Sequence, residues 1–267
     1  MSAAPDWDDV FANMAHIPGS DRFPADWAAR AANFRAQAGR WQTQHYGPRP
    51  RNELDLFYPD TAPRGLFVFV HGGYWMATCK DDWSHLARGA VAQGYAACLP
   101  SYTLAPDASL AEIAGEIAQA VEHAADIIPG PLHLAGHSAG GQLCARLMCA
   151  DGGLPAARLD RLARVTCISG VYDLRPLRQT RMNPTLRLSA AEAERESPLL
   201  HAPVRDVPTT VWVGANERPE FLRQARAMAA AWAPYATLSV EPNRHHFDVL
   251  DGLEDAKSPL MRAILAP

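Results

Sequence analysis

One serine flanked by glycines, in the stretch Gly136 to Gly141, constrains the fold of this chain more than any other feature. The stretch reads GHSAGG, and it follows the apolar run Pro131 to Ala135 and precedes the helix-like segment Gln142 to Leu147. A serine on so tight a strand-to-helix turn is a nucleophile elbow, G-x-S-x-G, where only glycine fits two residues to either side. We therefore predict that Ser138 projects into a cleft above a sheet. The backbone N–H groups at the helix N-terminus, beginning with that of Ala139, then point toward the place where a negative oxygen develops.

The chain around this elbow alternates between strand-like and helix-like segments from residue 54 onward. Short apolar runs predict strands at 54–58, 66–70, 95–99, 131–135, 165–169, 209–214 and 236–240. Amphipathic spacing predicts helices at 80–93, 110–127 and 220–232. This order predicts an α/β domain, a mostly parallel central sheet flanked by helices, in which ligands bind at the carboxyl ends of the strands. The 267 residues suit one such domain, 1–267.

Two segments fall outside this alternation. The N-terminal extension, residues 1–45, contains apolar residues at helical spacing: Trp27, Ala31, Phe34, Ala38 and Trp41. We expect a helix there that packs on the domain body, with a lid over the site as the alternative. The second segment, residues 171–206, holds scattered prolines and arginines and is expected to be a small cap-like insertion; a plain surface excursion is its alternative.

Composition excludes several classes of protein. Hydrophobic residues make up 48% of the chain and charged residues 20%, as in a globular protein with a sizeable core. The net charge of −4 comes without a clustered basic face, which argues against nucleic acid as a partner. The five cysteines show no paired spacing, and the N-terminal residues show no signal peptide or membrane span, so we expect a cytoplasmic protein with reduced thiols that binds no membrane. A homodimer is compatible with the sequence.

A nucleophilic serine needs a histidine as its base and an acid that orients the histidine. In the chain order that accompanies this elbow, the acid and then the histidine follow the serine. The pair His245 and His246 follows the last predicted strand; we favour His246 and keep His245 as the alternative. The first carboxylate after the strand 209–214 is Glu217, which we favour as the acid over the alternatives Glu220 and Asp173.

A second glycine-rich loop, His71 to Trp75, directly follows the strand predicted at 66–70. Gly72 and Gly73 leave backbone N–H groups free to face the cleft, where they can form an oxyanion hole together with that of Ala139. Tyr74 and Trp75 are predicted to form part of the substrate pocket, with simple packing of the loop as the alternative.

These motifs together resemble the kynurenine formamidase-like branch of the α/β-hydrolases, which is related to hormone-sensitive-lipase type esterases. The resemblance rests on HGGYW at 71–75, SYTLAP at 101–106, GHSAGG at 136–141, SGVYDL at 169–174, RPEFLRQ at 218–224 and HHFDVL at 245–250. It implies an α/β-hydrolase fold with the nucleophile on Ser138, the acid on Glu217, the base on His246, and oxyanion donors on Gly72, Gly73 and Ala139. The acid position is often aspartate in eukaryotic formamidases, and those enzymes tend to carry aspartate where this chain has His245.

The sequence therefore predicts a serine hydrolase of the carboxylesterase or arylformamidase type that acts on a small-molecule ester or aryl formamide. No cofactor and no metal are expected, because the histidine-rich zinc motif of the unrelated metal-dependent formamidases is absent from the sequence. By resemblance, N-formylkynurenine is the leading substrate; Arg178, Arg181 or Arg218 would hold its carboxylate. The alternatives are a catalytically silent α/β-hydrolase that binds a ligand or partner, and an acyltransferase using the same residues.

Overall fold

A computed structural model describes residues 5–266, so residues 1–4 and 267 of the predicted domain lie outside it. Its central sheet has eight strands in the order β1-β2-β4-β3-β5-β6-β7-β8. The strands are β1 (Arg40–His45), β2 (Glu53–Tyr58), β3 (Leu66–Val70), β4 (Ala96–Pro100), β5 (Leu132–His137), β6 (Leu162–Ile168), β7 (Thr209–Gly214) and β8 (Ala236–Glu241). Strands β1 and β2 join the sheet antiparallel, and all other pairs are parallel. The predicted mostly parallel α/β sheet is confirmed.

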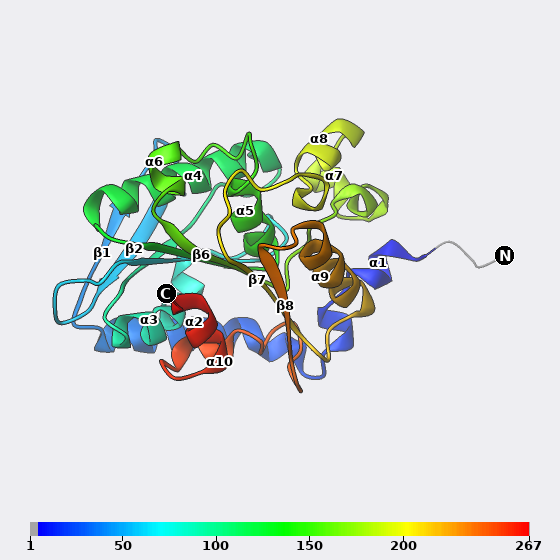
Figure 1. The fold of residues 1–267 in the computed structure, drawn as a ribbon. Helices are drawn as coiled ribbons and strands as arrows, with labels where there is room; N and C mark the ends of the chain where they lie inside the picture. The colour runs from blue at the N-terminus through cyan, green and yellow to red at the C-terminus, as the bar shows by residue number, and fades with distance from the viewer. Residues whose placement is uncertain (1–4, 267) are drawn as a thin grey trace.

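Helices cover both faces of this sheet (Figure 1). They are α1 (Trp7–Val10), α2 (Phe23–Gln37), α3 (Arg88–Ala92), α4 (Leu110–Ile127), α5 (Ala139–Leu147), α6 (Ala156–Leu159), α7 (Asn183–Leu186), α8 (Ala190–Arg195), α9 (Pro219–Ala231) and α10 (Pro259–Leu265). One buried cluster joins the sheet to α4, α5 and α9. A second cluster joins the opposite face to α2, α3 and α10. The two apolar layers are what hold the parallel strands between helices.

Local sequence explains the long helix and the elbow helix. Ser109 caps α4: its hydroxyl accepts the backbone N–H of Glu112, and the Glu112 carboxylate accepts the N–H of Ser109. All nine residues of α5 are buried, so the helix that begins at the elbow is a central element of the core. That burial fixes the position of Ser138 at its N-terminus.

Two predicted helices differ from the structure. The helix expected to include Trp41 ends at Gln37, and Trp41 lies instead in β1, where it pairs with Phe57 of β2. The helical spacing between Trp41 and the residues before it is a coincidence, because α2 has ended and the backbone is already extended at Ala38. The helix expected at 80–93 is divided into short 3-10 turns followed by α3.

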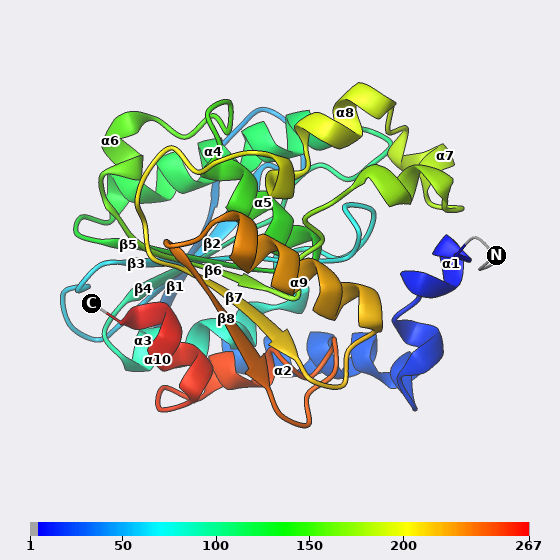
Figure 2. The same ribbon diagram turned by 45° about the vertical axis from the view of Figure 1, so that its right-hand side comes forward.

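The N-terminal segment crosses the end of the molecule where the parallel strands finish. Figures 1 and 2 both show α1 at the same end as α7 and α9, away from α6 and the C-terminus. No helix among residues 5–266 is long and apolar enough to cross a membrane.

Several histidines are buried in this fold with lowered pKa values. Burial, followed by the positive charges of Arg30, Arg88 and Arg35, lowers the pKa of His85 to about 3. Burial likewise lowers the pKa of His71 to about 4. A histidine whose pKa falls on folding is neutral in the native state but binds a proton when unfolded below about pH 6.5. The free energy of unfolding is therefore expected to fall as the pH drops from 6.5 toward 4.

The His85→Gln variant tests this pH dependence. Between pH 7 and pH 5, His85 alone is expected to cost the wild type about 2 kcal/mol of unfolding free energy. Urea unfolding of wild type and variant at both pH values measures that cost, and the variant should lose less stability by about this amount. Equal losses in wild type and His85→Gln would contradict the prediction.

Candidate active site

Ser138 lies between β5 and α5 in a backbone conformation with a positive φ. Its φ is 54° and its ψ −116°, and its backbone N–H donates to the carbonyl of Ile168 at 2.8 Å. A Cβ on Gly140 would come within 2.0 Å of the Val70 carbonyl oxygen at the end of β3. Any larger residue at 140 would push α5 away from the sheet, so this glycine is what lets the elbow close. A strained positive φ on a non-glycine residue is typical of functional positions.

Glu217 and His246 form a buried pair. His246 Nδ1 is 2.8 Å from Glu217 Oε2, and the exposed fractions of the two side chains are 4% and 0%. The other carboxylate oxygen of Glu217 accepts the backbone N–H of Gly214 at 2.9 Å and the hydroxyl of Ser169. Three donors therefore converge on Glu217, which fixes the carboxylate and, through it, the orientation of the imidazole.

The structure separates the favoured residues from their sequence alternatives. The His245 ring accepts the backbone N–H of Phe247 within its own turn, and the His245 N–H donates to Asp248. Among the acids, Glu220 pairs with Arg223 and Asp173 pairs with Arg175, and neither is bonded to a histidine. The geometry thus supports the prediction of His246 and Glu217 as partners.

His137, the residue before the nucleophile, holds the His246 backbone. Its Nε2 lies 2.9 Å from the His246 carbonyl oxygen, and the two rings are 4.6 Å apart. Burial, and then the nearby His246, lower the pKa of His137 well below its usual value. A neutral ring donates one N–H, and here that N–H goes to the carbonyl, so His137 positions the turn that carries His246.

The loop after β3 approaches the serine closely. A Cβ on Gly72 would lie 3.0 Å from the Ser138 Cβ and 2.9 Å from the His137 carbonyl oxygen. The loop's carbonyl groups are held from behind, because Thr78 Oγ1 donates to the Gly72 carbonyl at 3.0 Å and Tyr102 donates to that of His71 at 3.1 Å. With its carbonyls so engaged, the loop can present N–H groups beside Ser138. This arrangement supports the predicted oxyanion donors Gly72 and Gly73, together with Ala139 at the first position of α5.

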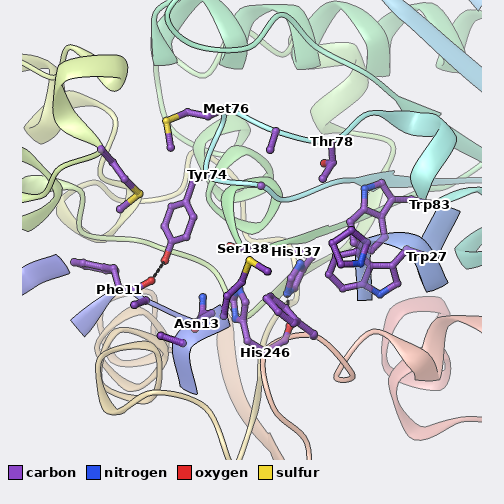
Figure 3. A pocket seen from close by; sticks show the side chains of 18 of the residues that line it. Phe11, Asn13, Trp27, Tyr74, Met76, Thr78, Trp83, His137, Ser138 and His246 are labelled. Carbon is purple, nitrogen blue, oxygen red and sulfur yellow. Dashed lines mark hydrogen bonds between the residues drawn. The ribbon is translucent and has the colours of Figure 1, made fainter. Parts of the chain in front are cut away.

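Ser138 and His246 line one cavity of about 580 Å³ (Figure 3). Most of its wall is apolar, and three aromatic rings form one side: Trp27 lies 4.6 Å from Trp83 and 5.3 Å from Phe247. Among the described residues, Asp8 is the only carboxylate that lines it, and no lysine or arginine does. The cavity therefore suits an uncharged, apolar or aromatic group.

The N-terminal extension covers this cavity. Its lining residues from that extension are Asp8, Phe11, Ala12, Asn13, Met14, Ala15, Pro24 and Trp27. The segment is bonded to the domain body: Tyr74 donates to the Phe11 carbonyl at 2.7 Å, and Arg218 donates to Asp9 at 2.6 Å. The predicted cap-like insertion, residues 171–206, contributes only Met182 to the described lining. The cover thus comes mainly from the N-terminus, and α2 both packs on the body and lines the site.

Two sets of residues predicted to contact the substrate differ from the structure. Tyr74 lines the cavity, but Trp75 is fully buried in the core, where its indole N–H donates to Gln142 at 3.1 Å. Both residues have a left-handed backbone, with φ values of 49° and 58°, yet only the Tyr74 side chain reaches the cavity. Of the three arginines proposed for a carboxylate, Arg181 pairs with Asp8, Arg218 pairs with Asp9, and Arg178 is exposed. None of the three lines the cavity.

Within residues 5–266, no group of three or more histidine, cysteine, aspartate or glutamate side chains is arranged to hold a metal ion. Sequence reasoning missed two residues of the site, Ser169 and Asn13. Ser169 has a φ of 51° at the end of β6, and the motif SGVYDL that contains it was its only sequence signal.

Known proteins resemble this chain in sequence and in fold. Residues 67–257 match the alpha/beta hydrolase family, which is more than half of the chain. The chain belongs to the alpha/beta hydrolase family. Within it, the chain is similar to curated proteins named kynurenine formamidase. The Salmo salar protein is 27% identical, with 82% of this chain and 79% of that protein covered. The Drosophila melanogaster protein is 30% identical, with 75% of this chain and 65% of that protein covered.

Solved structures extend the comparison. A candidate thioesterase from a Silicibacter species is 45% identical, with a TM-score of 0.94, and covers 98% of this chain and 100% of its own. Esterase B from Lactobacillus rhamnosis is 19% identical with a TM-score of 0.69, and the match covers 91% of this chain and 92% of that protein. At this identity the similarity shows that the two proteins share a fold and nothing more. This α/β-hydrolase is arylformamidase-like, so the predicted resemblance and fold are confirmed.

Proposed function

We propose that this α/β-hydrolase is a serine hydrolase that cleaves a carboxylic ester or an aryl formamide through an acyl-enzyme intermediate. One observation carries the proposal: Ser138 and His246 line the same cavity while the buried Glu217 holds His246 Nδ1 at 2.8 Å. A binding protein has no need for this arrangement, which argues against a catalytically silent protein.

The proposed reaction has two stages. Ser138 Oγ attacks the carbonyl carbon as its proton passes to His246 Nε2, and the negative oxygen faces the N–H groups of Gly72, Gly73 and Ala139. His246 then gives that proton to the leaving oxygen or nitrogen as its bond to carbon breaks. In the second stage, water loses a proton to His246 and attacks the acyl group, which releases the acid and restores Ser138. Transfer to an alcohol or thiol in place of water is the acyltransferase alternative.

Two observations support an aryl formamide as the substrate. The Trp27, Trp83 and Phe247 side of the cavity can pack against an aromatic ring, and two described relatives are named kynurenine formamidase. N-formylkynurenine is therefore the first substrate to test, although no arginine within residues 5–266 lines the cavity to hold its carboxylate. A thioester belongs in the same assay because a 45%-identical solved protein is a candidate thioesterase.

The experiment compares kcat/KM of the purified enzyme on N-formylkynurenine, p-nitrophenyl acetate and an aryl thioacetate, with labelling by a fluorophosphonate probe alongside. We expect labelling, and deformylation that the probe abolishes. Ester or thioester cleavage without deformylation would keep the mechanism and reject the formamide. No turnover together with no labelling would overturn the proposal in favour of a silent binding protein.

A further inference from the structure

Thr78 lies beside the predicted oxyanion loop in a backbone conformation that threonine rarely adopts. Its φ is 69°, and a positive φ on a β-branched residue is a strained outlier. Such strain persists only where the surrounding contacts fix it, and it is concentrated at functional positions. Thr78 also lines the cavity that contains Ser138 (Figure 3). The contacts made by its hydroxyl and by its carbonyl therefore bear on the active site.

The Thr78 hydroxyl holds the peptide group that carries the Gly73 N–H. Thr78 Oγ1 donates to the Gly72 carbonyl oxygen at 3.0 Å. That carbonyl and the Gly73 N–H belong to one planar trans peptide group, so they point in opposite directions. A donor on the carbonyl therefore fixes the direction of the N–H and also polarises it. Within residues 5–266 the Gly73 N–H is described with no acceptor, which leaves it for a substrate oxygen.

The neighbouring histidine leaves the hydrogen of the Thr78 hydroxyl to this carbonyl. His71 Nδ1 lies 2.8 Å from the Gly72 carbonyl oxygen and 3.0 Å from Thr78 Oγ1. Burial lowers the pKa of His71 to about 4, so at neutral pH the ring carries a single N–H. Nδ1 must hold that hydrogen, because two lone pairs so close together would repel. His71 is therefore a donor here, and both side chains donate to the Gly72 carbonyl.

Arg51 connects Thr78 with a second donor to the loop. From the turn between β1 and β2, Arg51 Nη2 donates to the Thr78 carbonyl at 2.6 Å, and its Nε donates to the Tyr102 carbonyl at 2.8 Å. Tyr102 is fully buried and donates its hydroxyl to the His71 carbonyl at 3.1 Å. The planar guanidinium thus holds Thr78 and Tyr102 at a fixed spacing. Arg51 is not among the residues that line the cavity, so its effect on the reaction must pass through these two residues.

We propose that Arg51, Thr78 and Tyr102 are positioning residues for the oxyanion hole. They hold the loop after β3 so that the Gly73 N–H meets the negative oxygen of the tetrahedral intermediate. That hydrogen bond strengthens as the charge develops, whereas the neutral carbonyl of the bound substrate gains little from it. A displaced N–H therefore weakens binding of the transition state and leaves binding of the ground state in place. This inference rests on the proposed function, because it concerns the same reaction.

The test uses two inhibitors of nearly the same shape, trifluoroacetophenone and acetophenone. Ser138 Oγ adds to the activated carbonyl of the trifluoroketone as its proton passes to His246, which leaves a negative oxygen on the former carbonyl. Acetophenone binds without this addition. The inhibition constant of the first ketone therefore reports stabilisation of the oxyanion, and that of the second reports the shape of the cavity alone.

Thr78→Val removes the hydroxyl and keeps the shape of the side chain. The variant is expected to lose roughly ten- to a hundredfold in kcat/KM on the best ester or formamide substrate, less than the loss of a whole oxyanion donor. Its inhibition constant for trifluoroacetophenone should rise by the same factor. Its inhibition constant for acetophenone should stay within about twofold of wild type, which also shows that the cavity is folded.

Further variants separate positioning from general support of the structure. Thr78→Ser keeps the hydroxyl and should restore kcat/KM to within about threefold of wild type. Arg51→Met and Tyr102→Phe should change kcat/KM and the trifluoroacetophenone constant together, as Thr78→Val does. Thr180→Val is the matched control, since Thr180 is a buried threonine outside the cavity wall whose hydroxyl donates to the Leu177 carbonyl at 2.7 Å. It should leave all three measurements unchanged.

The remaining outcomes distinguish this inference from the proposed function. Unchanged kcat/KM in Thr78→Val, or a loss that Thr78→Ser shares in full, would overturn the positioning role and leave the hydrolase standing. Equal weakening of both ketones would also overturn it, because a distorted cavity would then explain the loss. If the wild type cleaves no substrate, binds trifluoroacetophenone no more tightly than acetophenone and resists the fluorophosphonate probe, the proposed function fails, and the positioning role fails with it.

Discussion

The Ser138→Ala variant is expected to lose about 10⁶-fold in kcat on whichever ester or formamide the wild type cleaves. Alanine removes the only atom that can form the acyl-enzyme while leaving the elbow backbone, the cavity and the Glu217–His246 pair in place. What remains should be the weak catalysis by oriented N–H donors and substrate binding alone. Steady-state rates at saturating substrate measure the loss.

Ser169→Ala is the matched control for that variant. It makes the same change in a neighbouring buried serine and removes one donor to Glu217, whose carboxylate keeps the Gly214 N–H. A charge-assisted hydrogen bond is worth about 1.5–3 kcal/mol, so a loss of roughly ten- to a hundredfold is expected. If Ser138→Ala were no slower than Ser169→Ala, Ser138 would not be the nucleophile.

Glu217→Gln is expected to lower kcat by about 10⁴-fold with little change in structure. The side-chain carbonyl of the substituted glutamine would still accept the donors from Gly214 and Ser169, which turns the amide NH₂ group toward His246 Nδ1. Nδ1 must then be an acceptor, so the hydrogen of the neutral ring moves to Nε2. That tautomer cannot take the proton of Ser138, because the nitrogen that should accept it is already protonated.

Two measurements check this explanation for Glu217. Rates on the best ester substrate give the loss, and the nitrogen chemical shifts of His246 report which ring nitrogen carries the hydrogen in wild type and variant. Glu220→Gln is the control, since Glu220 pairs with Arg223 and should leave the rate within a few-fold of wild type. Full activity in Glu217→Gln would show that His246 is oriented by something else.

The parts of the site that follow from local sequence were predictable. The elbow is a local feature, because the glycines around Ser138 and the strand before it are adjacent in the chain. The Glu217–His246 pair followed from the order of elements, since each residue comes directly after a parallel strand and such strands end at one edge of the sheet. The geometry at both positions agrees with what the sequence predicts.

The remaining features depend on contacts between distant parts of the chain. Nothing near residue 13 indicates that it lies in a cavity with residues 138 and 246; that placement comes from hydrogen bonds of Tyr74 and Arg218 to the N-terminal segment. Trp75 follows Tyr74 directly, yet it is buried in the core, where its indole N–H donates to Gln142 of α5. Trp41 matched a helical spacing but pairs with β2. The local sequence pattern could not predict these three placements, because contacts between distant segments of the chain determine them.

The most direct test of the central claim is to locate the covalent adduct formed by a fluorophosphonate. The enzyme is inactivated with the probe, digested, and its peptides are analysed by mass spectrometry, with Ser138→Ala treated in parallel. The proposed mechanism predicts one adduct, on Ser138, formed in proportion to the lost activity and absent from the variant. An adduct on another residue that accounts for the inactivation, or full activity in protein modified at Ser138, would contradict it.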